Sequence, residues 1–259
     1  MRMLSYNILD GGEGRADPLA EVILAQRADV VALVEADHPE VIDRIARRAN
    51  MDFIYAQGKR HGAALLSRWP IVSSVNHTLF GDGVDLSDVL LEATVRDDTG
   101  ADWPIFVVHL HAHARESDEE RRLQEIDAVL RATLVHRQTA RAHVLAGDFN
   151  ATSPVQQIDP QRCKQSTRDE WNANGGMLPR RAVQRLLDAG YVDTLHAVHP
   201  TDAPELGTFS TQFPGQRVDY IFTWGVAPAR LSSAWVEQDR LAKYASDHFP
   251  VGVEIRSDE

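Results

Sequence analysis

The sequence predicts an α/β protein of the α+β type, in which strands of mixed direction pack together with amphipathic helices. Short apolar runs recur along the 259 residues, and segments with helical spacing of apolar residues lie between them. Short turns at residues 67–70 and 97–100 join two pairs of these runs, as in antiparallel hairpins. Sheets that contain such hairpins are not purely parallel.

The expected strands share an apolar run that is bounded by polar residues, glycine or proline. The run at residues 29–34 is typical of a strand that is covered on both faces. In chain order, the strands are expected at residues 3–8, 29–34, 63–66, 71–75, 90–95, 105–109, 144–146, 218–224, 234–237 and 251–255.

The expected helices have apolar residues three or four positions apart. They are expected at residues 19–26, 39–49, 116–137 and 181–187. Pro39 falls in the first turn of the second helix, where proline is well tolerated. The clearest helix, over residues 116–137, is expected to place four apolar side chains on one face: Leu123, Ile126, Leu130 and Leu134.

No repeat or linker divides the chain, so residues 1–259 are expected to form a single domain, with a polar and basic loop excursion at about residues 153–180. No run approaches the roughly 18 apolar residues that a membrane span requires. The N-terminal residues show no signal peptide, and a single cysteine, Cys163, excludes an intramolecular disulfide. These features predict a cytoplasmic protein.

The net charge is −11 and the isoelectric point is about 5.4. Proteins that bind nucleic acid non-specifically usually present a basic surface that releases counterions. The acidic charge therefore makes long duplex DNA a less natural substrate, although carboxylates gathered around metal ions would account for part of it.

Polar and acidic residues recur where the apolar strands end, the place where sheet proteins gather their sites. Taken alone, Asn7 also suits a turn, and Glu35 also suits the cap of the helix that follows it. Asp148 and Asn150 are harder to dismiss, because residues two apart at a strand end point the same way. The complete set is Asn7, Glu35, His109, Asp148, Asn150, Asp219, Asp247 and His248.

The order of these motifs resembles the endonuclease/exonuclease/phosphatase (deoxyribonuclease-I-like) superfamily over nearly the whole chain. The motifs are Tyr6-Asn7-Ile8, Val34-Glu35, Gly62 to Arg68, Val108-His109-Leu110, Arg121-x-x-Gln124, Gly147-Asp148-Phe149-Asn150, Arg217 to Ile221 and Ser246-Asp247-His248. The resemblance implies a four-layer sandwich, with two mixed, largely antiparallel β-sheets packed face to face and helices on the outside. Val34 and Val108 depart from the Gln and Thr of many members, but neither change removes a ligand.

The resemblance also implies a divalent-metal-dependent phosphoesterase that uses Mg²⁺ or Mn²⁺. In this comparison Glu35 is the principal metal ligand, with Asn7 close by and Asp247 as a further ligand. His248 lies beside the scissile phosphate and Asp219 orients its imidazole, while His109 and Asn150 donate hydrogen bonds to the phosphoryl oxygens. Asp148 positions or deprotonates the water. The general base is left open between Asp148 and His248.

The excursion carries five basic residues and a tryptophan, and it has two interpretations. One is a solvated loop. The other is a lid that brings guanidinium groups to a substrate phosphate, with Trp171 stacking on a base or sugar. The basic residues are Arg162, Lys164, Arg168, Arg180 and Arg181.

Three rival interpretations remain. His109, His111 and His113 alternate, so on one strand face they would suit a zinc-dependent hydrolase, but the Asp-His pair that follows such histidines in metallo-β-lactamase-like enzymes is absent. A non-catalytic binding relative would be expected to lose some of the site residues, and all are present. Cys163 as a nucleophile has no marked partner base.

The substrate is left open among a small molecule, a lipid head group and a nucleic acid. The acidic charge favours a smaller or less charged phosphoester. No basic amphipathic helix indicates docking on a membrane surface, and no segment indicates a protein partner.

Overall fold

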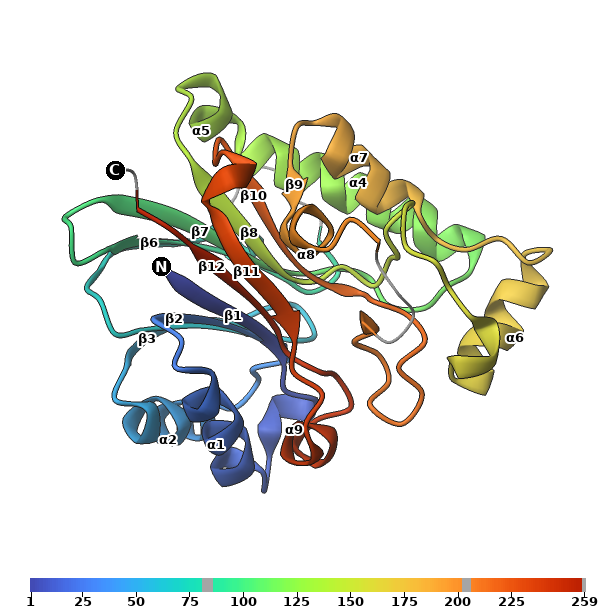
Figure 1. Cartoon of the computed structure of the whole chain (residues 1–259), viewed down its shortest axis with the longest axis horizontal. Helices are drawn as coiled ribbons and strands as arrows, with labels where there is room; N and C mark the ends of the chain where they lie inside the picture. The colour runs from blue at the N-terminus through green and yellow to red at the C-terminus, as the bar shows by residue number, and fades with distance from the viewer. Residues whose placement is uncertain (81–85, 202–205, 258–259) are drawn as a thin grey trace.

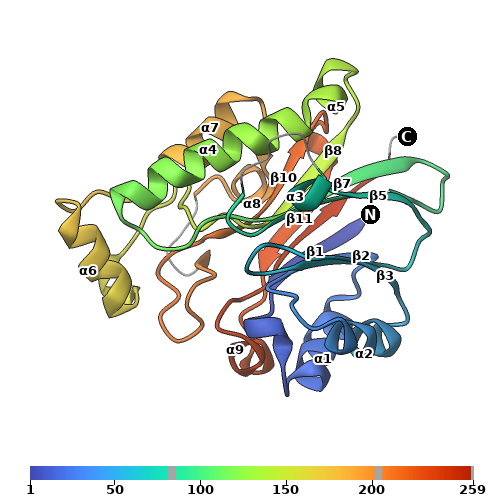
Figure 2. The ribbon, with the colours of Figure 1, turned by 180° about the vertical axis from the view of Figure 1, so that it is seen from behind.

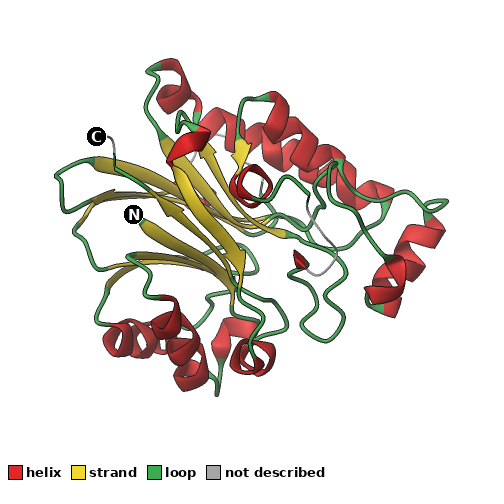
Figure 3. Ribbon diagram, viewed as in Figure 1, coloured by secondary structure: helices red, strands yellow, loops and turns green. Residues whose placement is uncertain are grey.

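Two six-stranded sheets form the centre of the protein, in a computed structural model that describes residues 1–80, 86–201 and 206–257 (Figure 3). The first sheet contains, in spatial order, β11 (Leu231–Val236), β12 (Val251–Ile255), β1 (Arg2–Asn7), β2 (Val30–Val34), β4 (Ala63–Ser67) and β3 (Asp52–Ala56). The second contains β5 (Ile71–Asn76), β6 (Val89–Arg96), β7 (Asp102–His109), β8 (His143–Asp148), β10 (Asp219–Trp224) and β9 (Val192–Asp193).

Helices cover the outer faces of both sheets (Figures 1 and 2). The first sheet is covered by α1 (Ala16–Gln26), α2 (Pro39–Ala49) and α9 (Arg240–Ala245), and the second by α4 (Glu116–Ala132) and α7 (Arg181–Asp188). Shorter helices are α3 (His77–Phe80), α5 (Leu134–Gln138), α6 (Gln165–Ala173) and α8 (Thr194–Val198). The order helix, sheet, sheet, helix confirms the predicted four-layer sandwich.

Period-two alternation along the strands builds three apolar layers from one sequence. In β1, Met3 packs between the two sheets, whereas Leu4 and Tyr6 pack under the helices of the first sheet. In β7, Val107 faces the space between the sheets and Phe106 faces the helices of the second sheet. Both faces of these strands are buried, which explains why their sequences read as continuous apolar runs.

Both sheets are mixed and largely antiparallel, as predicted. The pairs β1–β2 and β7–β8 are parallel, and the other eight neighbouring pairs within the described sheets run antiparallel. The two parallel pairs matter for function, because strands that run together end at the same edge of their sheet.

Some predicted elements were wrong in detail. Residues 116–137 form two helices, α4 and α5, separated at the fully buried Thr133, whose hydroxyl donates to the carbonyl of Leu130 at 3.4 Å. Leu134 therefore leaves the buried face of α4 and is 42% exposed. The short elements β3, β9, α3, α8 and α9 were not predicted. The excursion, which was expected as a loop, contains the helix α6.

Candidate active site

Three predicted site residues lie in one row across the second sheet. His109 at the end of β7 is paired with Asp148 at the end of β8, and Asp148 is paired with Asp219 at the start of β10. Val107 and Ala146, two residues earlier in β7 and β8, pack between the sheets, so the three polar side chains project to that same side. All three are at most 3% exposed.

The close approach of β7 and β8 depends on Gly147. Its φ is +141°, and a Cβ atom there would lie 1.9 Å from the carbonyl oxygen of Val108. Glycine thus lets the two strands run close enough to set His109 beside Asp148, where His109 Nε2 lies 3.7 Å from Asp148 Oδ2.

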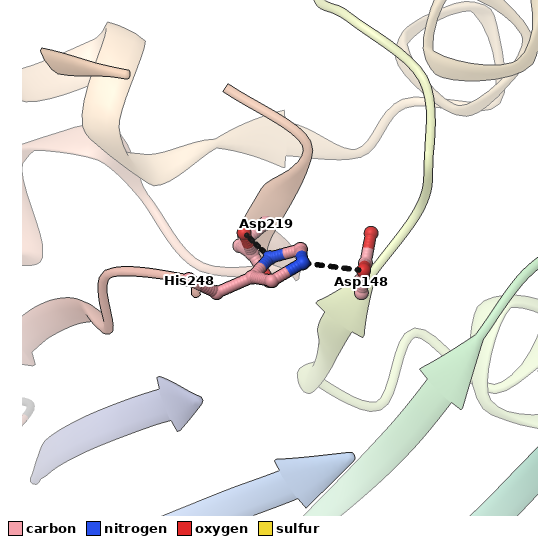
Figure 4. A group of neighbouring side chains, drawn as sticks. All are labelled: Asp148, Asp219 and His248. Carbon is pink, nitrogen blue, oxygen red and sulfur yellow. Dashed lines mark hydrogen bonds and ion pairs between the residues drawn. The ribbon is translucent and has the colours of Figure 1, made fainter. Parts of the chain in front are cut away.

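His248 joins this row from the loop before β12 (Figure 4). Its Nδ1 lies 2.8 Å from Asp219 Oδ2, and its Nε2 lies 3.8 Å from Asp148 Oδ2. Ser246 holds the loop in place, because its hydroxyl donates to the carbonyl of Asn7 and accepts the backbone N–H of His248. We call Asp148, Asp219 and His248 the Asp–His–Asp cluster.

Burial and charge shift the protonation of this cluster in opposite senses. Burial works against protonation of His248, but the carboxylates of Asp219 and Asp148 outweigh it and raise the pKa of His248 to about 10. Burial, with the neighbouring Asp219, raises the pKa of Asp148 to about 6, although His248 and His109 oppose the rise. At neutral pH the cluster therefore holds an imidazolium between two carboxylates.

Asn7, at the end of β1, and Glu35, directly after β2, approach the row from the opposite sheet. The amide of Asn7 donates to Glu35 Oε1 at 2.9 Å and to Asp148 Oδ2 at 3.1 Å, so it ties the two sheets together at the site. Glu35 also accepts the backbone N–H of Asp10 at 2.9 Å. Its φ of +52° is unusual for a residue with a side chain, and such strain gathers at functional sites.

The carboxylate of Glu35 stays ionised. Burial acts to raise its pKa, but His109, the Asp10 N–H and the Asn7 amide together lower it. Asp247 differs, because burial and the charge of Glu35 raise its pKa despite His248 and Lys164. Its Oδ1 is buried and has no hydrogen-bond partner among the described residues.

Two groups in the site have the chemistry to hold a metal ion. Within the described part of the chain, the Asp–His–Asp cluster is the one set of three or more His, Cys, Asp or Glu ligand atoms within 4.8 Å of one another. The second is formed by the ionised Glu35 and the unpartnered Asp247 oxygen, both of which offer the hard oxygen ligands that Mg²⁺ and Mn²⁺ prefer.

Asn150 completes the predicted set. Its φ is +49°, and its backbone N–H donates to Asp148 Oδ1 at 2.8 Å. Its side-chain Nδ2 lies 2.9 Å from the carbonyl of Leu110 and 3.3 Å from His109 Nε2. The structure therefore brings together Asn7, Glu35, His109, Asp148, Asn150, Asp219, Asp247 and His248.

Three further residues at the site were missed by the sequence analysis. The ring of His61 lies 5.7 Å from that of His109, and its Nδ1 lies 2.9 Å from Asp37. This partner raises the pKa of His61 to about 9, despite its partial burial. Phe209 packs on the imidazole of His248, with ring centroids 4.7 Å apart. All three lie in loops and carry no strand-end signal.

Three of the four arginines of the excursion bind protein oxygens and do not form a guanidinium lid over the site. Arg180 donates to the carbonyls of Ser153 and Gln156, and Arg181 pairs with Glu116 and Glu120. Arg168 donates to carbonyls within the excursion itself. Lys164 is the exception and lies over the ring of Phe209.

Trp171 is not available for stacking, because it is 3% exposed and packs with Cys163 and Ala114 in a small apolar cluster. Cys163 is buried as well, and burial raises its pKa to about 11, so its thiol is a poor nucleophile.

The zinc interpretation finds no support in the described residues. His109 lies in the buried row, whereas His111 Nε2 faces Asp118 at 3.2 Å and His113 Nδ1 faces Glu170 at 3.1 Å. The three imidazoles turn to different partners because β7 ends at His109, so the alternation expected of a strand does not continue.

Comparisons with known proteins agree with this architecture. The model of the endonuclease/exonuclease/phosphatase family matches residues 4–248. No curated protein matches the chain. An AP endonuclease from Archaeoglobus fulgidus superposes with a TM-score of 0.75 and 18% identity, covering 99% of this chain and 100% of its own.

A variant of the 3′ phosphatase NExo from Neisseria, bound to a product DNA hairpin, superposes with a TM-score of 0.74 and 21% identity, covering 99% of this chain and 100% of its own. The catalytic domain of Xenopus laevis APE2 superposes with a TM-score of 0.68 and 15% identity, covering 100% of this chain and 94% of its own. At these identities the likeness is one of fold.

Proposed function

Because the chain belongs to the endonuclease/exonuclease/phosphatase family, we propose that it hydrolyses a phosphoester by attack of an activated water, with a divalent metal ion, Mg²⁺ or Mn²⁺. The observation that carries the proposal is the row His109–Asp148–Asp219, which the two sheets complete with His248, Glu35 and Asn7. A non-catalytic relative would have no need to keep this buried, costly set of charges.

Asp148 is the general base in this proposal. His248 carries a proton at neutral pH and both its nitrogens face carboxylates, so it has no free lone pair with which to accept a proton from water. The pKa of Asp148 is raised to about 6, a little below neutral pH. Its carboxylate is therefore mostly ionised at neutral pH and still basic enough to accept a proton from the attacking water. Its Oδ1 is held by the Asn150 N–H.

His248, His109 and Asn150 stabilise the negative charge that develops on the phosphoryl oxygens. Asp219 fixes the ring of His248 through Nδ1, which directs Nε2–H towards the reacting group. His109 and Asn150 lie on the opposite side of Asp148, with a nitrogen–nitrogen distance of 3.3 Å. Donors arranged in advance around the reacting phosphate contribute more than donors that must first reorganise.

Glu35 and Asp247 would hold the metal ion, with Asn7 fixing the Glu35 carboxylate. Glu35 keeps lone pairs free after accepting from Asn7 and Asp10, and the buried Asp247 Oδ1 lacks a partner, as expected of a ligand without its cation. The Asp–His–Asp cluster suits a metal less well, because its imidazolium already compensates the two carboxylates. The metal, when bound, neutralises phosphate charge and polarises the ester.

The proposal is tested with bis-p-nitrophenyl phosphate and p-nitrophenyl phosphate, assayed with Mg²⁺, Mn²⁺ or EDTA. We expect metal-dependent release of nitrophenol by the wild type and a loss of about 10²–10³-fold in His248→Ala, the range for removal of one transition-state donor. A folded His248→Ala protein with wild-type turnover would contradict the assignment. No turnover of either ester with any metal would favour the non-catalytic interpretation.

A further inference from the structure

A cavity of about 310 Å³ lies beside the Asp–His–Asp cluster, between α6 and the loop that precedes β10. Asn150 forms the wall next to the catalytic row, and Phe209 and Lys164 form the wall below the excursion. A second cavity of about 330 Å³ is lined by Asp247 and also by Lys164. Lys164 therefore lines two cavities, each of which has a residue of the site in its wall.

Lys164 is held near the reacting groups through Phe209. Its ammonium lies 5.6 Å from the centroid of the Phe209 ring, and that ring lies 4.7 Å from the ring of His248. The distance from the ammonium of Lys164 to the ring centroid of His248 therefore cannot exceed the sum of these two distances. Burial raises the pKa of Asp247, and Lys164 is among the groups that oppose this rise, which also places its charge near the site.

Lys164 is also free to bind a ligand. Arg168, Arg180 and Arg181 are engaged by carbonyl or carboxylate oxygens of the protein. Lys164 is exposed, and its ammonium makes no hydrogen bond or ion pair with any residue that the structure describes. A free ammonium beside a phosphoesterase site is a ready partner for a phosphate group.

The one acidic residue in the wall of the first cavity has partners in the protein. This residue is Glu170, and its carboxylate accepts the backbone N–H of Ala114 at 2.8 Å and faces His113 Nδ1 at 3.1 Å. The other wall residues near α6 include the hydroxyls of Ser166 and Thr167, which can donate to phosphate oxygens.

We propose that this cavity is a substrate subsite in which Lys164 binds a second phosphate group, carried by the substrate next to the scissile phosphoester. The inference rests on the proposed function and deepens it: the preferred substrates are compounds with at least two phosphates, not isolated monoesters or singly charged diesters. The excursion at residues 153–180 then contributes one lysine to specificity, and not the guanidinium groups of the lid interpretation.

The test is calorimetric binding in excess MgCl₂, so it does not depend on turnover. The probes are thymidine 3′,5′-bisphosphate, thymidine 5′-monophosphate and thymidine 3′-monophosphate. We expect wild-type protein to bind the bisphosphate at least about tenfold more tightly than either monophosphate. The second phosphate accepts a hydrogen bond from the charged ammonium of Lys164, and such a bond is stronger than one between neutral groups. Lys164→Met should lose this preference, and Lys164→Arg should retain most of it.

Lys243→Met is the matched control, since Lys243 lines only the second cavity of the two and is exposed. It should keep the preference for the bisphosphate. The proposal is overturned if wild-type protein shows no such preference, or if Lys164→Met keeps it. Either result leaves metal-dependent hydrolysis of bis-p-nitrophenyl phosphate intact, whereas failure of the proposed function abolishes that hydrolysis without changing the binding test.

Discussion

His248 and Asp219 form a buried imidazole–carboxylate pair in which Nδ1 lies 2.8 Å from Oδ2. Asp219 belongs to β10 and His248 to the loop before β12, so the pair joins the two sheets at the edge where the site lies. The carboxylate stabilises the proton on Nδ1 and fixes the direction in which Nε2–H points.

Asp219→Asn should lower turnover of bis-p-nitrophenyl phosphate by about 10²–10³-fold, because loss of the carboxylate charge lowers the pKa of His248 and makes its ring a weaker donor to the phosphoryl oxygens. The fold should persist, since the substituted side chain has nearly the same shape. Asp98→Asn, at an exposed aspartate in the β6–β7 turn, is the control and should be silent. Equal turnover in the two variants would remove Asp219 from the mechanism.

The dependence of kcat/KM on pH should be bell-shaped. The rate should rise as Asp148 loses its proton near pH 6 and fall as His248 loses its proton at about 10, because the base acts ionised and the imidazole acts protonated. A bound cation favours both deprotonated forms, so it should move both limbs to lower pH. A rate that increases as the pH falls below 6 would contradict the role of Asp148.

Glu35→Gln should raise the Mg²⁺ concentration needed for half-maximal turnover by about tenfold or more, because the carboxamide carries no charge to attract the ion. Asp247→Asn should act in the same direction. Titration of activity with Mg²⁺ after treatment with EDTA measures both effects. Glu40→Gln, at an exposed glutamate of α2, should leave the Mg²⁺ requirement unchanged. If Glu35→Gln needs the same Mg²⁺ concentration as the wild type, Glu35 is not a ligand of the metal ion.

The strand-end residues could be predicted from sequence because an apolar run and its period of two define both where a strand ends and which way its side chains point. This argument found His109 and Asp148, whereas Asp219 falls inside the expected strand at residues 218–224 and was found through its motif. It could not find His61 or Phe209, whose positions depend on loop conformations that are set by distant contacts. For example, the backbone N–H of His61 donates to the carboxylate of Asp88, the residue that directly precedes β6.

Local sequence patterns also gave wrong predictions where tertiary contacts determined the end of a helix or the partner of a charged side chain. The helical spacing at residues 116–137 continues past Thr133, but burial of Thr133 and the turn into α5 end the helix there. The basic excursion has a composition typical of an anion-binding lid, yet most of its arginines bind protein oxygens. Composition does not distinguish a free cation from a paired one. The single-domain organisation of residues 1–259 stays a prediction.

His143 should make the protein less stable as the pH falls from 6.5 towards 4. Its ring is fully buried, with Nδ1 donating to the carbonyl of Arg141 and Nε2 accepting from the hydroxyl of Tyr191, each at 2.9 Å. Both partners suit a neutral imidazole. Burial accordingly lowers the pKa of His143 from 6.5 to about 4. Between these values the unfolded chain binds a proton that the folded chain excludes, so the free energy of unfolding decreases with decreasing pH.

The expected decrease that is due to His143 is about 3 kcal/mol between pH 6.5 and 4. Urea unfolding followed by tryptophan fluorescence at several pH values measures it, as the difference in slope between wild type and His143→Gln. The variant is expected to be less stable at pH 7, because a glutamine cannot reproduce the stacking on Trp224, but its stability should fall less steeply in acid. His113→Gln, at an exposed histidine, should keep the wild-type slope. Parallel pH dependences for wild type and His143→Gln would show that His143 is not the group that titrates.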